Sequence, residues 1–191
     1  MIYSDPYKFI FLAIPKTGSR SIQDYLQKFG TRSKKGWDPN HDGYSKTMEK
    51  LGPQRQDYFK FAFFRNPWSL LISTYFYNRN KYHWSTDKPS IQRWIETYKG
   101  DPYLGYLFDD SGNLGLDFCG KLENIKNDLS TVCNKIGIDI PNNISHVGKQ
   151  NYRERLHYTE YYDTPQLINR VKTVFSKSLS ILKYEFDDAP R

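Results

Sequence analysis

The strongest constraint on the fold is an abrupt change of hydrophobic pattern near the N-terminus. Residues 8–14, KFIFLAI, form a nearly continuous apolar run, which is typical of a strand buried on both faces of a parallel sheet. Residues 15–18, PKTG, interrupt this run. Apolar residues then recur at helical spacing, at Ile22, Tyr25, Leu26 and Phe29, and Gly30 is expected to end the helix in a left-handed cap. The pattern predicts a strand, a loop and a helix in direct succession.

A second change of the same kind follows. Residues 59–64, FKFAFF, predict another buried strand, and Asn66 and Pro67 are residue types that suit a helix cap and a first helical turn. An apolar stripe then indicates a helix, at Trp68, Leu71, Ile72, Tyr75 and Phe76. The chain is therefore predicted to contain two strand-turn-helix units.

The rest of the chain continues this alternation. We expect a short strand at 116–119, a helix from Leu122 to Ile136 closed by Gly137, a helix starting at Thr164-Pro165 and a terminal strand at 184–186. Strands that alternate with helices predict an α/β fold, a three-layer sandwich around a mainly parallel central sheet. At 191 residues, the chain is expected to form a single domain spanning 1–191.

The amino-acid composition limits the classes of binding partner and the cellular compartment that we expect. The net charge of +7 favours an anionic partner, but nucleic acid, membrane headgroups, a nucleotide and an acidic polysaccharide all remain open. No apolar run approaches the roughly eighteen residues of a membrane span. The N-terminal run fits a strand better than a signal peptide, and Cys119 and Cys133 alone make a disulfide framework improbable. We therefore expect a cytoplasmic protein.

The first candidate site is the loop PKTGSRS at 15–21, which enters a helix. A helix N-terminus offers unpaired N–H groups and a positive dipole end to a phosphate or sulfate. Gly18 permits close backbone approach, Lys16 adds a mobile charge, and hydroxyl donors follow at Thr17, Ser19 and Ser21. A Walker A loop places its Lys after the second Gly, whereas Lys16 precedes Gly18, so an ATP or GTP loop is disfavoured. An ordinary Ser/Thr-capped helix is the alternative.

The second candidate site follows residues 59–64. Arg65 could grip a phosphate in a bidentate mode, with the Ser73 hydroxyl as a lateral donor. Asn66 and Ser69 share a helix face with Ser73. The alternative is that Arg65 neutralises a nearby carboxylate. Two anion sites in one chain suit a donor with phosphates at both ends.

These two segments carry a resemblance to a known family. FIFLAIPKTGSRSIQDYL resembles the 5′-phosphosulfate loop, and FKFAFFRNPWSLLISTY the 3′-phosphate motif, of sulfotransferases that use 3′-phosphoadenosine-5′-phosphosulfate (PAPS). The closest group is the carbohydrate type, which includes heparan-sulfate 2-O-sulfotransferase-like and chondroitin or HNK-1-type enzymes. The resemblance continues through residues 117–129 and 157–186. It implies a P-loop NTPase-like α/β fold.

The resemblance also implies roles for individual residues. The 5′-phosphosulfate would be bound by Lys16, Thr17, Gly18, Ser19, Arg20 and Ser21, and the 3′-phosphate by Arg65 and Ser73. Lys16 would offset charge on the leaving oxygen, with no metal required. Two departures stand out: Arg20 replaces a small residue, and Ser69-Leu70 replaces a common Asp-Arg pair. Neither removes a named phosphate ligand.

An acceptor hydroxyl needs a general base, and His41 is the leading candidate. Histidine accepts a proton near neutral pH, and His41 lies between the two motifs, where the resembling enzymes place their catalytic histidine. Alternative bases remain open at His83, His146, His157, Asp42 and Glu123. The acceptor is expected to be a carbohydrate, with aromatic residues for stacking at Tyr75, Tyr77, Tyr82, Trp84, Trp94 and Tyr98, and basic residues to steer it at Lys149, Arg153 and Arg155. Nucleic acid is not expected as a partner.

Two rival functions use the same features. A nucleotide kinase would also need a strand-loop-helix anion site, but its Walker Lys and a Mg²⁺-binding acidic residue are not evident. A non-catalytic polyanion or nucleic-acid binder would use the positive charge and the aromatic side chains. Binding that prefers PAPS or its product over ATP-Mg²⁺ and over polyanions would separate the three.

Overall fold

The computed structural model describes residues 1–32, 42–81, 89–144 and 156–187. The chain divides into two compact units. Unit 1 comprises Met1–Phe64 and Pro102–Gln150, and unit 2 comprises Arg65–Asp101 and Asn151–Arg191. The prediction of a single domain spanning 1–191 stays a prediction.

Unit 1 is built on a five-stranded sheet with the strand order β3-β1-β2-β4-β5. The strands are β1 (Ile2–Ser4), β2 (Phe9–Leu12), β3 (Thr31–Arg32), β4 (Phe59–Phe64) and β5 (Phe118–Lys121). β2, β4 and β5 are parallel, whereas β1 pairs antiparallel with both β2 and β3. The α/β prediction is confirmed, but within the described residues the sheet is mixed. The antiparallel edge arises because a tight turn returns the chain directly from β1 into β2.

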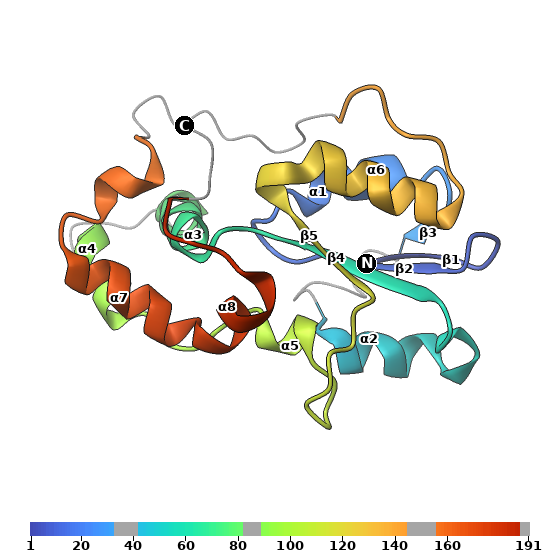
Figure 1. Cartoon of the computed structure of the whole chain (residues 1–191), viewed down its shortest axis with the longest axis horizontal. Helices are drawn as coiled ribbons and strands as arrows, with labels where there is room; N and C mark the ends of the chain where they lie inside the picture. Colours follow the sequence, from blue (N-terminus) through green and yellow to red (C-terminus); the bar gives the residue numbers. More distant parts are fainter. Residues whose placement is uncertain (33–41, 82–88, 145–155, 188–191) are drawn as a thin grey trace. The chain divides into compact units, whose positions relative to one another are not determined.

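Helices cover both faces of this sheet (Figure 1). α1 (Ser19–Leu26) and α6 (Ile125–Ile136) lie on one face, and α2 (Tyr44–Leu51) and α5 (Leu104–Leu107) lie on the other. The core of the first face joins α1 and α6 to Phe9, Phe11, Phe61 and Phe63. On the second face, the ring of Phe64 meets Tyr103 edge-on at 5.0 Å. Since both faces are covered, β2 is buried at every position, as its continuous apolar run predicted.

Unit 2 is helical over its described residues. It contains α3 (Pro67–Lys81), α4 (Ile91–Thr97), the 3-10 helix η3 (Tyr158–Tyr161), α7 (Pro165–Val174) and α8 (Ser176–Leu182). An aromatic series runs through its interior, with ring centroids 6.3 Å apart for Tyr75 and Trp94, 5.6 Å for Trp94 and Tyr98, and 6.2 Å for Tyr98 and Phe175. These rings therefore pack against one another, which explains three of the aromatic residues proposed for sugar stacking.

Three predicted boundaries are wrong. Residues 184–186 form no strand; the Glu185 carbonyl instead accepts a hydrogen bond from the Asn66 side chain at 2.7 Å, and the Phe186 carbonyl accepts one from the Tyr158 hydroxyl. α1 ends at Leu26, and Gly30 is not left-handed. Gly30 passes so close to β1 that a Cβ there would lie 2.5 Å from the Tyr3 carbonyl oxygen. The strand predicted at 116–119 lies at 118–121.

The other helix boundaries follow the sequence closely. α6 is preceded by the 3-10 helix η2 (Leu122–Asn124) and ends at Gly137, whose φ of 71° is left-handed as predicted. Thr164 and Pro165 start α7. A left-handed glycine therefore ends α6, and a proline in the first helical turn begins α7.

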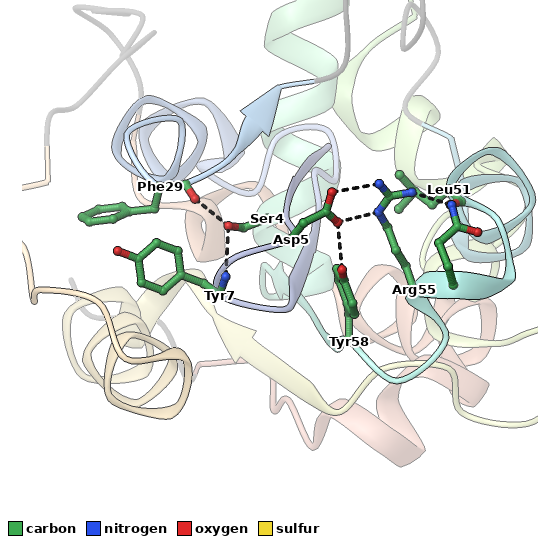
Figure 2. A network of polar contacts seen from close by, with 8 residues as sticks. Ser4, Asp5, Tyr7, Phe29, Leu51, Arg55 and Tyr58 are labelled. Carbon is green, nitrogen blue, oxygen red and sulfur yellow. Dashed lines mark hydrogen bonds and ion pairs between the residues drawn. The ribbon is translucent and has the colours of Figure 1, made fainter.

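A polar network holds the turn between β1 and β2 in place (Figure 2). Arg55, in the 3-10 helix η1 (Pro53–Arg55), donates from Nε and Nη2 to the two Asp5 carboxylate oxygens at 2.7 and 2.9 Å. The Tyr58 hydroxyl donates to Asp5 at 2.8 Å. Arg55 Nη1 also donates to the Leu51 carbonyl at 2.8 Å. The network thus ties the β1–β2 turn to the connection that leads from α2 into β4.

This network should make the stability of the folded state depend on pH, through the ionisation of Asp5. The hydrogen bonds from Arg55 and then Tyr58 lower the pKa of Asp5 from 3.8 to about 2. Because the folded pKa lies below the unfolded one, the stabilisation is present above about pH 4 and is lost as the pH falls towards 2. We expect Asp5→Asn to lower the thermal midpoint at pH 7, and the difference from wild type to shrink between pH 4 and pH 2. Thermal melts across pH 2–7 measure this, and a pH-independent difference would contradict it.

Candidate functional site

The parallel strands bring their carboxyl ends to one edge of the unit 1 sheet. Ligands of open α/β sheets bind outside such an edge. The loop after β2 and the segment after β5 meet there, because a Cβ on Gly18 would lie 2.6 Å from Leu122 Cδ1. Asp128, on α6, holds the end of β5 by accepting the Lys121 N–H at 2.6 Å and the Asn124 side-chain amide at 2.8 Å. No local sequence pattern indicates the contact between Leu122 and Gly18.

The loop between β2 and α1 has an unusual backbone. Lys16 and Gly18 are both left-handed, with φ of 65° and 74°. For a residue with a side chain, this conformation costs about 1–2 kcal/mol. Between them, the buried Thr17 hydroxyl donates to the Ile14 carbonyl at 3.0 Å and so braces the turn. Strain of this kind persists where surrounding contacts hold it, and it is common in ligand-binding loops.

The loop presents the start of α1 without a side-chain cap. Gly18 occupies the N-cap position, and no acidic residue lies in the first turn. The Ser21 N–H donates to the Gly18 carbonyl at 3.0 Å, so the N–H groups that the start of the helix leaves unpaired within it are those of Ser19 and Arg20, at the positive end of the helix dipole. Ser19 is only 5% exposed, and its hydroxyl makes no hydrogen bond to another residue of the described ranges. The arrangement is therefore electrostatically suited to an anion.

The sequence-predicted residues of this loop lie together, with different surroundings. Lys16 and Gly18 are half-buried, and Ser19 and Ser21 are buried in the first turn. Arg20 is exposed to solvent. The Thr17 hydroxyl donates its proton to the Ile14 carbonyl. In this structure it therefore bonds the backbone and not, as the sequence predicted, an anionic ligand.

Arg65 and Ser73 lie at the start of unit 2. Arg65 directly follows β4 in the chain, and its Nε donates to the Ser69 hydroxyl oxygen at 2.9 Å. Asn66 caps α3 as predicted, since its side-chain oxygen accepts the N–H groups of Trp68 and Ser69 at 3.1 and 3.4 Å. Ser73 is 5% exposed, and its hydroxyl makes no hydrogen bond to a described residue. The Arg65–Ser69 bond is a second contact that sequence analysis did not predict.

Several candidate bases and acceptor contacts fall outside the described residues. They are His41, His83 and His146, together with Tyr82, Trp84, Lys149, Arg153 and Arg155. Their roles stay predictions.

Asp42 is held as an anion. Burial opposes its ionisation, but hydrogen bonds from Lys50 and Lys46 outweigh burial and lower the pKa of its carboxyl. The Lys46 Nζ lies 3.1 Å from Asp42 Oδ1, and Lys50 contacts the other carboxylate oxygen. A carboxylate with a lowered pKa is a weaker proton acceptor. Asp42 is therefore a poorer candidate base than a histidine.

His157 and Glu123 are the other described candidates. In unit 2, His157 Nδ1 lies 2.8 Å from the Thr159 hydroxyl, whereas its Nε2 is buried without a hydrogen-bond partner among the described residues. Glu123, in unit 1, belongs to η2 next to the Leu122 that contacts Gly18. An imidazole nitrogen sealed from solvent and ligands cannot take a proton from an acceptor, so His157 is also disfavoured.

Comparison with known proteins identifies one family. Residues 1–103, more than half of the chain, match the sequence model described as the sulfotransferase family, and this range includes both the 15–21 loop and the Arg65–Ser73 segment. No curated protein and no solved structure matches the chain. Over the part of the chain that the structure describes, no helix has the length and apolar character needed to cross a membrane.

The left-handed backbone of Lys16 and Gly18 should affect the free energy of unfolding differently when the two residues are replaced. Replacing Lys16 with Gly removes the strain of its φ of 65°, so we expect Lys16→Gly to leave the free energy of unfolding unchanged or raise it by up to about 1 kcal/mol. Gly18→Ala introduces strain at φ 74° and should lower it by about 1–2 kcal/mol. Chemical denaturation of both variants tests this, and a Lys16→Gly variant less stable than Gly18→Ala would contradict it.

Proposed function

Because the chain belongs to the sulfotransferase family and is a sulfotransferase enzyme, we propose that it transfers the sulfuryl group of PAPS to an acceptor hydroxyl, most suitably on a carbohydrate. The observation that carries this proposal is the uncapped, acid-free start of α1 behind the left-handed Lys16-Thr17-Gly18 turn. Together with three parallel strands that end at the same edge, it supports a P-loop NTPase-like arrangement of the donor site.

The 5′-phosphosulfate end of the donor is assigned to residues 15–21. The N–H groups at the start of α1 would bind its oxygens, and the Ser19 hydroxyl, which makes no hydrogen bond to a described residue, can add one. Gly18 leaves room for close backbone approach. Arg20 is exposed, so we assign it a role at the mouth of this site and not among its closest ligands.

The 3′-phosphate end is assigned to Arg65 and Ser73. A guanidinium binds phosphate with two parallel hydrogen bonds, and the buried Ser73 hydroxyl supplies another. The order of the two motifs along the chain, and not a distance, supports their assignment to one donor molecule. This proposal accords with the prediction that residues 1–191 act as one domain.

The reaction requires little covalent chemistry from the protein. The acceptor oxygen forms a bond to sulfur as the bond from sulfur to the bridging phosphate oxygen breaks. The leaving product is 3′-phosphoadenosine-5′-phosphate (PAP), and the acceptor proton passes to a base. Positioning and charge stabilisation therefore carry catalysis. Lys16 would stabilise charge on the leaving oxygen, by analogy with phosphoryl transfer, and no metal is needed for that role.

His41 is proposed as the base. The low basicity of Asp42 and the sealed Nε2 of His157 weaken two of its rivals. His41 immediately precedes Asp42 in the chain, on the segment that leads into α2. A histidine with an ordinary pKa can accept the acceptor proton near neutral pH.

Removal of Arg65 tests the donor assignment. We expect Arg65→Ala to weaken PAP binding by about 1.5–3 kcal/mol, roughly 10- to 150-fold, because it removes a charged hydrogen bond. Isothermal titration with PAP measures the change, and Arg79→Ala, an exposed arginine on the same helix α3, is the matched control. Equal affinities for the Arg65 variant and wild type would remove Arg65 from the site. Tighter binding of ATP-Mg²⁺ than of PAP would overturn the choice of donor.

Removal of His41 tests the base separately. We expect His41→Ala to abolish sulfuryl transfer while PAP affinity stays nearly unchanged, because the base contacts the acceptor and not the donor. Transfer of labelled sulfate from PAPS to a panel of glycans measures this, with His157→Gln as the control expected to retain turnover. Normal turnover by His41→Ala would move the role to another residue.

A further inference from the structure

We infer that Ser69 is a positioning residue for Arg65, setting the plane of its guanidinium before the donor binds. The inference rests on the proposed function, because it concerns the same 3′-phosphate site. Its evidence is the hydrogen bond of 2.9 Å from Arg65 Nε to Ser69 Oγ, together with the burial of Ser69, which is 5% exposed. The bond lies entirely within unit 2.

The position of Ser69 is itself fixed by the start of α3. Its backbone N–H donates to the Asn66 side-chain oxygen at 3.4 Å, so Ser69 is part of the cap. The Asn66 side-chain nitrogen donates to the Glu185 carbonyl at 2.7 Å, which anchors the cap to the C-terminal segment. A series of hydrogen bonds thus runs from Glu185 through Asn66 to Ser69 and Arg65. The hydroxyl that receives Arg65 is therefore held by the fold.

Arg65 bonds Ser69 through Nε, and this determines how the rest of the guanidinium is oriented. The guanidinium is planar and rigid, so a bond at Nε sets the plane in which both Nη groups lie. Bidentate phosphate binding requires that plane to be correct. Ser73 follows Ser69 by four residues on α3, so the two hydroxyls share one face of the helix. Ser69 would orient the arginine, and Ser73 would contact the anion beside it.

This role differs from that of a ligand. Ser69 Oγ accepts the bond from Arg65 Nε, so in this role it acts on the arginine, and the absence of a further loss in the Arg65→Ala background separates that role from direct donation of its O–H to the phosphate. Removal of the Ser69 hydroxyl leaves the charge of Arg65 in place but removes the bond at Nε, so part of the orientation of the guanidinium must be gained when the donor binds. We therefore expect a moderate loss of donor affinity with an unchanged salt dependence, because the number of charges at the site is the same.

The experiment compares PAP dissociation constants of five variants in the full chain: Ser69→Ala, Ser69→Thr, Ser178→Ala, Arg65→Ala and the Arg65→Ala/Ser69→Ala double variant. We expect Ser69→Ala to raise the constant about 5- to 10-fold, the effect of one hydrogen bond, and Ser69→Thr, which keeps the hydroxyl, to stay near wild type. Ser178→Ala is the control, since Ser178 is also a buried unit 2 serine and donates to the Phe175 carbonyl at 3.2 Å. In an Arg65→Ala background, Ser69→Ala should add no further loss. Thermal melts verify folding, and Ser69→Cys, with a poorer acceptor atom, replaces the alanine variant if that one unfolds.

The outcomes separate the two proposals. A wild-type protein that does not bind PAP overturns the proposed donor. If wild type binds PAP and Arg65→Ala weakens it, but Ser69→Ala binds like wild type, the donor site stands and the inference on Ser69 is overturned. An equal loss from Ser69→Ala with and without Arg65 also overturns it, because the effect would then not pass through the arginine.

Discussion

Burial of both faces of the central strands determines where this protein can place its chemistry. Every residue of β2 is at most 1% exposed, and Phe61 to Phe64 of β4 are fully buried. An unpaired polar group in such a layer would cost several kcal/mol, so the strands carry no site. Because β2, β4 and β5 are parallel, their chains all leave the apolar layer at one edge. Polar loops and helix starts therefore gather at that edge.

The loop at this edge combines strain with bracing. Lys16 adopts a left-handed backbone that a side chain disfavours, and the Thr17 hydroxyl and the packing of Leu122 on Gly18 hold the turn. A glycine at position 16 would relieve the strain but would remove the charge. Lys8 and Lys183 also adopt left-handed backbones, with φ of 49° and 52°, so the strain at Lys16 does not by itself assign a function to its side chain.

Local patterns predicted the elements whose causes are local. The run KFIFLAI, the interrupting PKTG and the helical stripe after it are contiguous, so both the strand-loop-helix and the Lys16–Ser21 cluster were evident from sequence. The Asn66 cap and the Gly137 stop were predictable for the same reason. β1 and β3 were missed because three and two residues are too few to show a period, and they alone make the sheet mixed. Gly30 was misread because its tight contact with Tyr3 is tertiary. The contacts of Leu122 with Gly18 and of Ser69 with Arg65 likewise depend on packing that no short window contains.

The hydroxyls of Ser19 and Ser73 differ from those of nearby helical threonines in whether they bond to the helix backbone. On α3, the Thr74 hydroxyl donates to the Leu70 carbonyl one turn back at 2.9 Å, and on α7 Thr173 does the same to Asn169. Such a bond satisfies a hydroxyl inside the helix and leaves it inert towards ligands. Ser19 and Ser73 are each 5% exposed, yet neither makes a bond of this kind within the described residues. Neither hydroxyl oxygen is among the fully buried atoms that lack a hydrogen-bond partner in the described residues, so each can bind water and can exchange that water for a ligand. Of the serines in the two motifs, Ser19 and Ser73 therefore each have a hydroxyl that can donate a hydrogen bond to a group outside the described residues.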